Sequence, residues 1–216
     1  MNKRHNYFKY LFYIYKVLYM SHNSNGKVFI LHCENANPEQ HWYLWLEQQL
    51  KSEGIAAECI FLADSNHPEA EIWQTCLETQ LQDLNEQSIV VSHGLSCIAV
   101  AHFLAKHLQK TQLKACLFIA AFNEPIAKFP EYDEFIKHSN FTSAVIRANV
   151  KRRLVFFSTN DPIVPVPLTF KFSNLLNAQL IEAEAVQAGH FRTEDGYSTF
   201  PQLLQILQTL VKAELS

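Results

Sequence analysis

The feature that most constrains the fold is a regular alternation of two kinds of segment, which begins at Lys27. Short runs rich in β-branched and aromatic residues alternate with amphipathic segments of about 12 to 16 residues, a pattern typical of βαβ units and a parallel sheet. The expected strands are 27–32, 56–61, 87–92, 114–120, 152–158 and 178–183. The expected helices are 39–52, 69–84, 95–109, 166–177 and 199–213. The alternation predicts an α/β fold, built as a three-layer sandwich with helices on both faces of the sheet.

We expect one domain, over residues 27–213. The sequence of 216 residues contains no internal repeat and no linker to a second domain. Residues 1–26 are expected to be a basic, aromatic leader and a polar linker. Lys9 and Lys16 interrupt the apolar run of the leader, so we do not expect it to span a membrane stably. Two interpretations of it stay open: a membrane-surface segment, or a leader appended upstream of a domain that starts at Met20.

One stretch, residues 122–150, breaks the rhythm with Pro125, Pro130 and mixed polar residues. We expect it to be an irregular excursion over the C-terminal edge of the sheet. Loops at that edge usually build ligand sites in α/β proteins.

Charge and cysteine content exclude several classes of function. The 18 Lys and Arg against 21 Asp and Glu give a net charge of -3, so no excess of positive charge is available to bind nucleic acid or an anionic membrane. The five cysteines include no C-x-x-C pair, which favours reduced thiols in a cytoplasmic protein. His102 and His107 are five residues apart, not the four that place two zinc ligands on one helical face. We expect no metal and no cofactor.

Polar residues follow three of the expected strands, at the edge where ligands bind in parallel sheets. The third strand leads into Ser92-His93-Gly94-Leu95-Ser96, small residues before an apolar helix, which has the shape of a nucleophile elbow. Asp161 follows the fifth strand and His190 follows the sixth. An elbow, an acid and a histidine, in that order along the chain, are typical of α/β-hydrolases.

Because these motifs occur together and in the same order, residues 27–210 resemble the small serine hydrolases of the retinoblastoma-binding protein 9 family. The loop after the first strand and the segment 41–46, His-Trp-Tyr-Leu-Trp-Leu, are similar to the opening helix of that family. The resemblance implies hydrolysis of a small ester or amide through an acyl-enzyme, with Asp161 and His190 as the retained acid and base. We expect the six strands to lie in the order 2-1-3-4-5-6, with a crevice where strands 1 and 3 part.

The sequence departs from the family at the nucleophile. The family pattern Gly-His-Ser-x-Gly is matched here by Ser92-His93-Gly94-Leu95-Ser96, so that Gly94 stands where the attacking serine should be. Glycine has no side-chain atom that can attack a carbonyl. Glycine adopts strained dihedral angles readily, so we expect the turn itself to be retained.

The oxyanion donors of the superfamily are backbone N–H groups, one after the nucleophile and one from the first-strand loop. Here they would come from Leu95 and from the loop containing Cys33 and Glu34. Such donors need no particular side chain, so a pocket for an anion or carbonyl could persist. Glu34 would repel an anionic ligand if it points inward. We expect His93 to line the elbow.

Three hypotheses about function follow. The first is a catalytically impaired member of the family that binds a small acyl or ester-like ligand, or a protein partner of unknown identity. The second is an active hydrolase that uses Ser96, a thiol at Cys33 or a water activated by His190; Ser92 is a weaker candidate. The third is a protein-interaction scaffold in which the crevice plays no part.

Overall fold

The computed structural model describes residues 26–109, 111–184 and 187–213. The leader at residues 1–25 lies outside this range, so the two interpretations of it stay predictions. The described residues form one sheet of six parallel strands in the order β2-β1-β3-β4-β5-β6, which confirms the expected order. The strands are β1 (Val28–Leu31), β2 (Ala57–Ile60), β3 (Ile89–His93), β4 (Leu113–Ile119), β5 (Val150–Phe157) and β6 (Gln179–Glu182).

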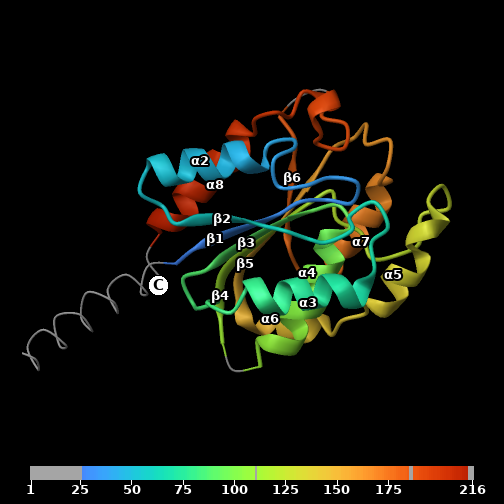
Figure 1. The fold of residues 1–216 in the computed structure, drawn as a ribbon, viewed down its shortest axis with the longest axis horizontal. Helices are drawn as coiled ribbons and strands as arrows, with labels where there is room; N and C mark the ends of the chain where they lie inside the picture. The colour runs from blue at the N-terminus through green and yellow to red at the C-terminus, as the bar shows by residue number, and fades with distance from the viewer. Residues whose placement is uncertain (1–25, 110, 185–186, 214–216) are drawn as a thin grey trace, which may run out of the picture.

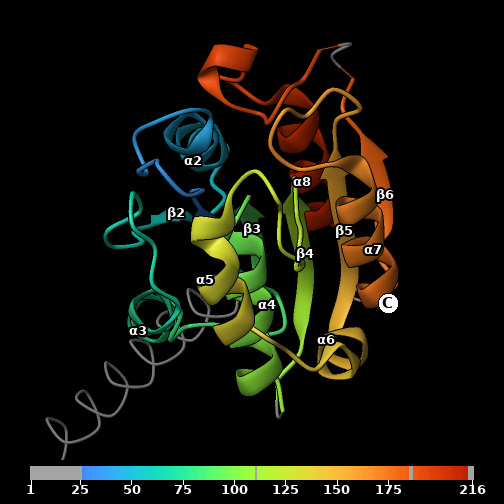
Figure 2. The ribbon, with the colours of Figure 1, turned by 90° about the vertical axis from the view of Figure 1, so that its right-hand side faces the viewer.

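Helices cover both faces of the sheet and make a three-layer sandwich (Figures 1 and 2). Helices α2 (Tyr43–Ser52) and α8 (Pro201–Lys212) lie on one face. The other face carries α3 (Ala70–Gln80), α4 (Ser96–His107), α5 (Asp133–His138), α6 (Ser143–Asn149) and α7 (Val166–Leu176). Two short 3-10 helices, η1 (Pro130–Tyr132) and η2 (Thr193–Asp195), lie in the connections.

The core consists of two apolar layers, because successive side chains of a strand point to opposite faces. In β1, Val28 and Ile30 pack with α2 and α8, whereas Phe29 and Leu31 pack with α3 and α4. All residues of β1, β3 and β4 are buried. The central strands are therefore buried along their whole length and mostly apolar, as expected of a parallel sheet covered on both faces.

Several expected boundaries were wrong, for local reasons. The first helix starts at Tyr43 and not at 39, because His41 has a φ of 54°, which an α-helix cannot accommodate. Helix α3 ends at Gln80 and not at 84. There the Asn85 side chain bonds the backbone of Asp83 and Gln87, and such local bonds favour a turn over a helix.

Residues 122–150 are more regular than expected, since they contain η1, α5 and α6. Only their first part reaches the C-terminal edge of the sheet, where the Tyr132 hydroxyl accepts a hydrogen bond of 3.0 Å from Asn35, in the loop after β1. Helix α5 then packs against α3, and α6 packs against α4 and leads to the start of β5 (Figure 2).

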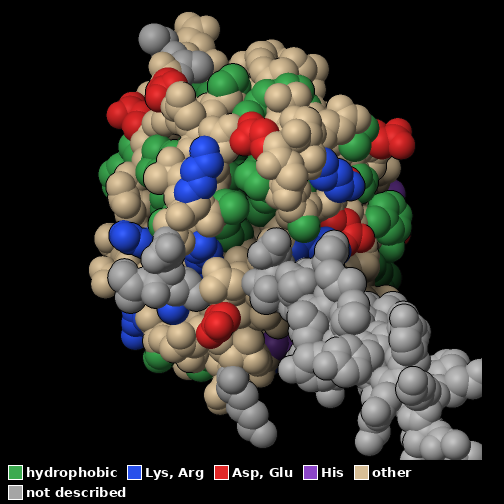
Figure 3. Space-filling model, turned by 90° about the vertical axis from the view of Figure 1, so that its left-hand side faces the viewer, with side chains coloured by type: hydrophobic (Ala, Val, Ile, Leu, Met, Phe, Trp, Pro, Cys, Tyr) green, Lys and Arg blue, Asp and Glu red, His purple; other side chains and the backbone are tan. Residues whose placement is uncertain are grey.

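The surface of the described residues agrees with the balanced charge of the sequence. Lys, Arg, Asp and Glu side chains are intermingled over the face shown in Figure 3. Within the described ranges, no helix has the length and apolar character needed to cross a membrane.

Candidate active site

The turn between β3 and α4 has the backbone of a nucleophile elbow. Gly94 has a φ of 58°, in the left-handed region that residues other than glycine rarely adopt. Its N–H donates to the Ile119 carbonyl at 2.9 Å, which ties the turn to the end of β4. Leu95 is the N-cap of α4, and Ser96 is its first residue. The predicted strand-turn-helix is therefore present, with no side-chain atom at its apex.

Asp161 and His190 meet beside this turn, although 29 residues separate them in the sequence. The Asp161 Oδ2 to His190 Nδ1 distance is 2.8 Å. Asp161 Oδ1 accepts the N–H groups of Ile163 at 2.8 Å and Val164 at 3.0 Å. Because this carboxylate accepts a hydrogen bond from the Nδ1–H group, the neutral imidazole keeps its lone pair at Nε2. A β-carbon at Gly94 would lie 3.3 Å from that Nε2.

The loop that presents His190 depends on a glycine. Gly189 has a φ of 52°, and a β-carbon there would lie 2.1 Å from Asp195 Oδ1. The Asp195 carboxylate in turn accepts the His190 N–H at 2.9 Å. Gly189 therefore permits the close approach that fixes the backbone of His190.

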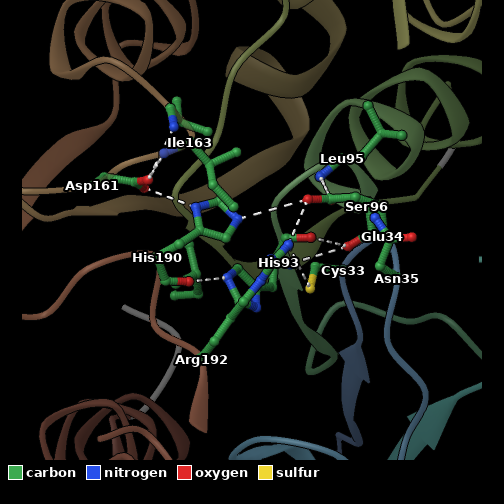
Figure 4. A network of polar contacts seen from close by, with 12 residues as sticks. Cys33, Glu34, Asn35, His93, Leu95, Ser96, Asp161, Ile163, His190 and Arg192 are labelled. Atoms are coloured by element: carbon green, nitrogen blue, oxygen red, sulfur yellow. Dashed lines mark hydrogen bonds and ion pairs between the residues drawn. The ribbon is translucent and has the colours of Figure 1, made fainter. Parts of the chain in front are cut away.

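Glu34 fills the space above the turn (Figure 4). Its Oε2 accepts the Leu95 N–H at 2.9 Å, and its Oε1 accepts a hydrogen bond of 2.9 Å from Arg192. The same Oε1 lies 3.8 Å from His190 Nε2, and 1% of the Glu34 side chain is exposed. The carboxylate thus points inward, and it occupies the N–H group that would bind a substrate oxyanion.

Arg192 is a site residue that the sequence analysis missed. Its guanidinium forms the ion pair with Glu34, and 17% of its side chain is exposed. It also lies 3.9 Å from the Cys33 sulfur. Its position two residues after His190 was the available signal, because a short loop places both residues near the same crevice.

A separate series of hydrogen bonds runs through Tyr43 and His93. The Cys33 N–H donates to the Tyr43 hydroxyl at 3.1 Å, and that hydroxyl lies 2.6 Å from His93 Nδ1. His93 Nε2 is 2.8 Å from the His190 carbonyl, which can only accept. His93 therefore carries its proton at Nε2 and accepts at Nδ1. Burial, together with the nearby His190 and Arg192, lowers its pKa well below the ordinary value, so it is neutral at pH 7.

The other candidate nucleophiles are two serines, whose hydroxyl groups are hydrogen-bonded to neighbouring atoms, and one buried cysteine. Ser96 Oγ accepts the His93 N–H at 3.0 Å and donates to the His93 carbonyl at 2.9 Å. Ser92 Oγ donates to the Cys97 sulfur at 3.4 Å. Burial, with a smaller contribution from the Glu34 carboxylate, raises the pKa of the Cys33 thiol to about 12. These contacts do not favour an activated hydroxyl or thiolate at any of the three positions.

The structure therefore brings together most of the predicted site residues: Cys33, Glu34, His93, Gly94, Leu95, Asp161 and His190. Trp42, which lies just before α2, also supports the site. It is fully buried, and its indole N–H donates to the Phe191 carbonyl at 3.1 Å. A hydrogen bond to the residue after His190 helps to hold the histidine loop.

Comparison with known proteins agrees with this geometry. The family model described as serine hydrolase matches residues 28–209. The chain is 29% identical over 189 residues to YdeN of Bacillus subtilis, covering 87% of this chain and 97% of that protein. It is 23% identical over 180 residues to the serine hydrolase RBBP9 of Rattus norvegicus, covering 81% and 88% of the two chains.

Solved structures show the same relationship. The crystal structure of the Bacillus subtilis ydeN gene product matches with a TM-score of 0.81 and 27% identity, over 87% of this chain and all of that one. Mouse alpha/beta hydrolase domain-containing protein 10 matches with a TM-score of 0.62 at 14% identity, over 86% and 89% of the two chains. The second likeness concerns the fold alone. With a family model that spans nearly all of the described residues, this chain belongs to the serine hydrolase family.

Proposed function

We propose that this protein is a catalytically impaired member of the serine hydrolase family, in which an ester or amide is no longer cleaved through an acyl-enzyme. The observation that carries the proposal is the Glu34 carboxylate, bonded to the Leu95 N–H directly above Gly94. Acyl transfer needs an attacking oxygen and a free oxyanion donor. Residue 94 has no side-chain oxygen, and the Leu95 N–H is occupied by an internal anion.

The same contacts support a role in binding a small molecule. Asp161 and His190 remain hydrogen-bonded in the arrangement that orients a catalytic base. A small ligand that reaches His190 must take the place of the Glu34 carboxylate or approach it closely, because Glu34 and His190 are each 1% exposed. Glu34 is therefore the group that decides which ligands the site accepts.

The experiment combines an activity-based label with an esterase assay. We expect no labelling of the purified protein by a fluorophosphonate probe and no hydrolysis of a p-nitrophenyl ester of a short acid beyond that of the His190→Gln variant. Ser96→Ala is the matched control, since Ser96 lies two residues after the missing nucleophile and is the serine that the active-hydrolase hypothesis uses. Robust labelling that Ser96→Ala abolishes would show that a serine is active and would overturn the proposal.

The five cysteines support a reducing compartment, for which we propose the cytoplasm. All five thiols are free. A disulfide-forming environment would favour pairing or modification of exposed thiols.

A further inference from the structure

We propose that Glu34 is itself a nucleophile, and that the site hydrolyses compounds with a leaving group on a saturated carbon, through an ester formed on the Glu34 carboxylate. The inference rests on the proposed loss of serine chemistry, because it assigns a different reaction to the same residues. Carboxylates form covalent intermediates in several classes of enzyme. The position of Glu34, the free nitrogen of His190 and the contact with Leu95 each support the assignment.

The first support is the position of the carboxylate. Glu34 Oε2 lies 2.7 Å from the point where a β-carbon at residue 94 would stand, and His190 Nε2 lies 3.3 Å from the same point. In a serine hydrolase that β-carbon bears the attacking oxygen. The carboxylate therefore stands between the turn and the imidazole, close to the place where this fold delivers its nucleophile. Its Oε2 lies at the turn, and its Oε1, the oxygen that we assign to the attack, faces His190 Nε2 at 3.8 Å.

The second support is a buried nitrogen with no use in the closed site. Among the described residues, His190 Nε2 has no hydrogen-bond partner. Its ring is oriented by Asp161 through Nδ1, and its Nε2 faces Glu34 Oε1 at 3.8 Å. Leaving a buried polar atom unpaired costs about 1–3 kcal/mol. An oriented imidazole with a free lone pair beside a carboxylate is the arrangement that activates water against a carboxyl ester.

The third support decides the class of substrate. The Leu95 N–H bonds Glu34 Oε2, so it cannot at the same time polarise the carbonyl of a substrate. Attack by a carboxylate on an ordinary ester would also form an anhydride and expel a poor alkoxide leaving group. A saturated carbon that bears a halide or sulfonate requires no oxyanion donor on the substrate. The Leu95 N–H then polarises the carboxyl carbon of Glu34 itself.

The reaction balances in two stages. A lone pair of Glu34 Oε1 forms a bond to the carbon of an alkyl bromide, and the carbon-bromine bond breaks with bromide keeping the electron pair. His190 Nε2 then takes a proton from water, and the hydroxide attacks the Glu34 carboxyl carbon. The negative charge collects on Oε2, which the Leu95 N–H holds, while Asp161 stabilises the imidazolium.

The intermediate collapses as the bond to the alkyl oxygen breaks and the imidazolium proton passes to that oxygen. The products are an alcohol, bromide and a proton released by Glu34. The alcohol therefore carries an oxygen from Glu34, and the oxygen of water stays in the carboxylate. We place the entrance beside Arg192, because it is the partly exposed residue among the side chains bonded to Glu34.

The experiment uses a primary alkyl bromide with the full-length protein and follows Glu34 by peptide mass spectrometry. We expect bromide release by the wild type, and alkyl adducts at Glu34 that accumulate at least about tenfold in His190→Gln, because the ester forms but is not cleaved. Glu34→Gln should abolish both signals. Glu39→Gln, at an exposed glutamate of the same loop, is the matched control and should change neither.

A single turnover in water enriched in oxygen-18 gives a test that needs no variant. We expect the heavy isotope in the Glu34 peptide and ordinary oxygen in the alcohol. Heavy oxygen in the alcohol alone, adducts confined to cysteines, or bromide release unchanged in a folded Glu34→Gln protein would each overturn the assignment. None of these results bears on the esterase assay, so the failure of this inference and that of the proposed function are distinguishable.

Discussion

A side chain at residue 94 requires Glu34 to move: a β-carbon at Gly94 would lie 2.7 Å from Glu34 Oε2. Carbon and oxygen atoms without a bond between them do not approach so closely without a shift of one of them. Loss of the serine and the inward carboxylate are therefore coupled features of one site.

This coupling predicts that Gly94→Ser by itself does not restore esterase activity. Glu34 still occupies the Leu95 N–H and meets the new side chain. The double variant Gly94→Ser with Glu34→Gly frees both, and we expect it to hydrolyse a p-nitrophenyl ester at least about 100-fold faster than the single variant, the usual effect of one oxyanion donor. Initial rates of p-nitrophenol release measure the difference. Equal rates in the two variants would contradict the coupling.

The ion pair between Glu34 and Arg192 predicts a strongly non-additive effect on stability. Arg192→Met leaves a carboxylate with 1% exposure without its cation, and we expect the free energy of unfolding to fall by about 3–5 kcal/mol. Glu34→Met together with Arg192→Met removes both charges and should recover most of this loss. Urea titrations of the four proteins in the cycle measure it. If the two single losses simply add, the pair is not coupled.

The buried His93 predicts a loss of stability in mild acid. Its pKa is lowered in the folded state, so below the unfolded value of about 6.5 the unfolded chain binds a proton that the folded protein does not. This contribution to the free energy of unfolding should therefore be fully present above that pH. Below it, the free energy of unfolding should fall by up to about 1.4 kcal/mol per pH unit for each such histidine. Burial also lowers the pKa of His32, which adds in the same direction.

The contribution of His93 is measured by urea titrations between pH 7.5 and 5.5. We expect His93→Gln to give a shallower dependence of the free energy of unfolding on pH than the wild type. Parallel curves for the two proteins would mean that His93 binds its proton equally well in the folded and the unfolded state.

The cysteines predict selective protection from alkylation. Burial raises the pKa of Cys33 to about 12 and raises those of Cys97 and Cys116 as well. At pH 8 we expect iodoacetamide to modify these three thiols far more slowly in the folded protein than in urea, as followed by peptide mass spectrometry. Rapid native labelling of Cys33 would instead favour a reactive thiol in the site.

Much of the fold could be predicted from local patterns. The alternation of apolar runs and amphipathic segments identified all six described strands, because burial on both faces of a parallel sheet leaves a strong signal in the sequence. The strand order, expected together with the family resemblance, was also confirmed. Residues 122–150 were harder to interpret, since short helices depend on packing more than on their own pattern. Here α5 packs against α3, and α6 packs against α4.

The sequence by itself determined that residue 94 has no nucleophilic oxygen, and that an acid and a histidine follow strands in the order typical of the fold. Tertiary structure alone decided the direction of the Glu34 side chain and its pairing with Arg192, 158 residues away. The physical reason is that the energy of a buried charge depends on which donors surround it. Glu34 follows β1, whereas its donors follow β3 and β6, and these connections meet only when the sheet is formed.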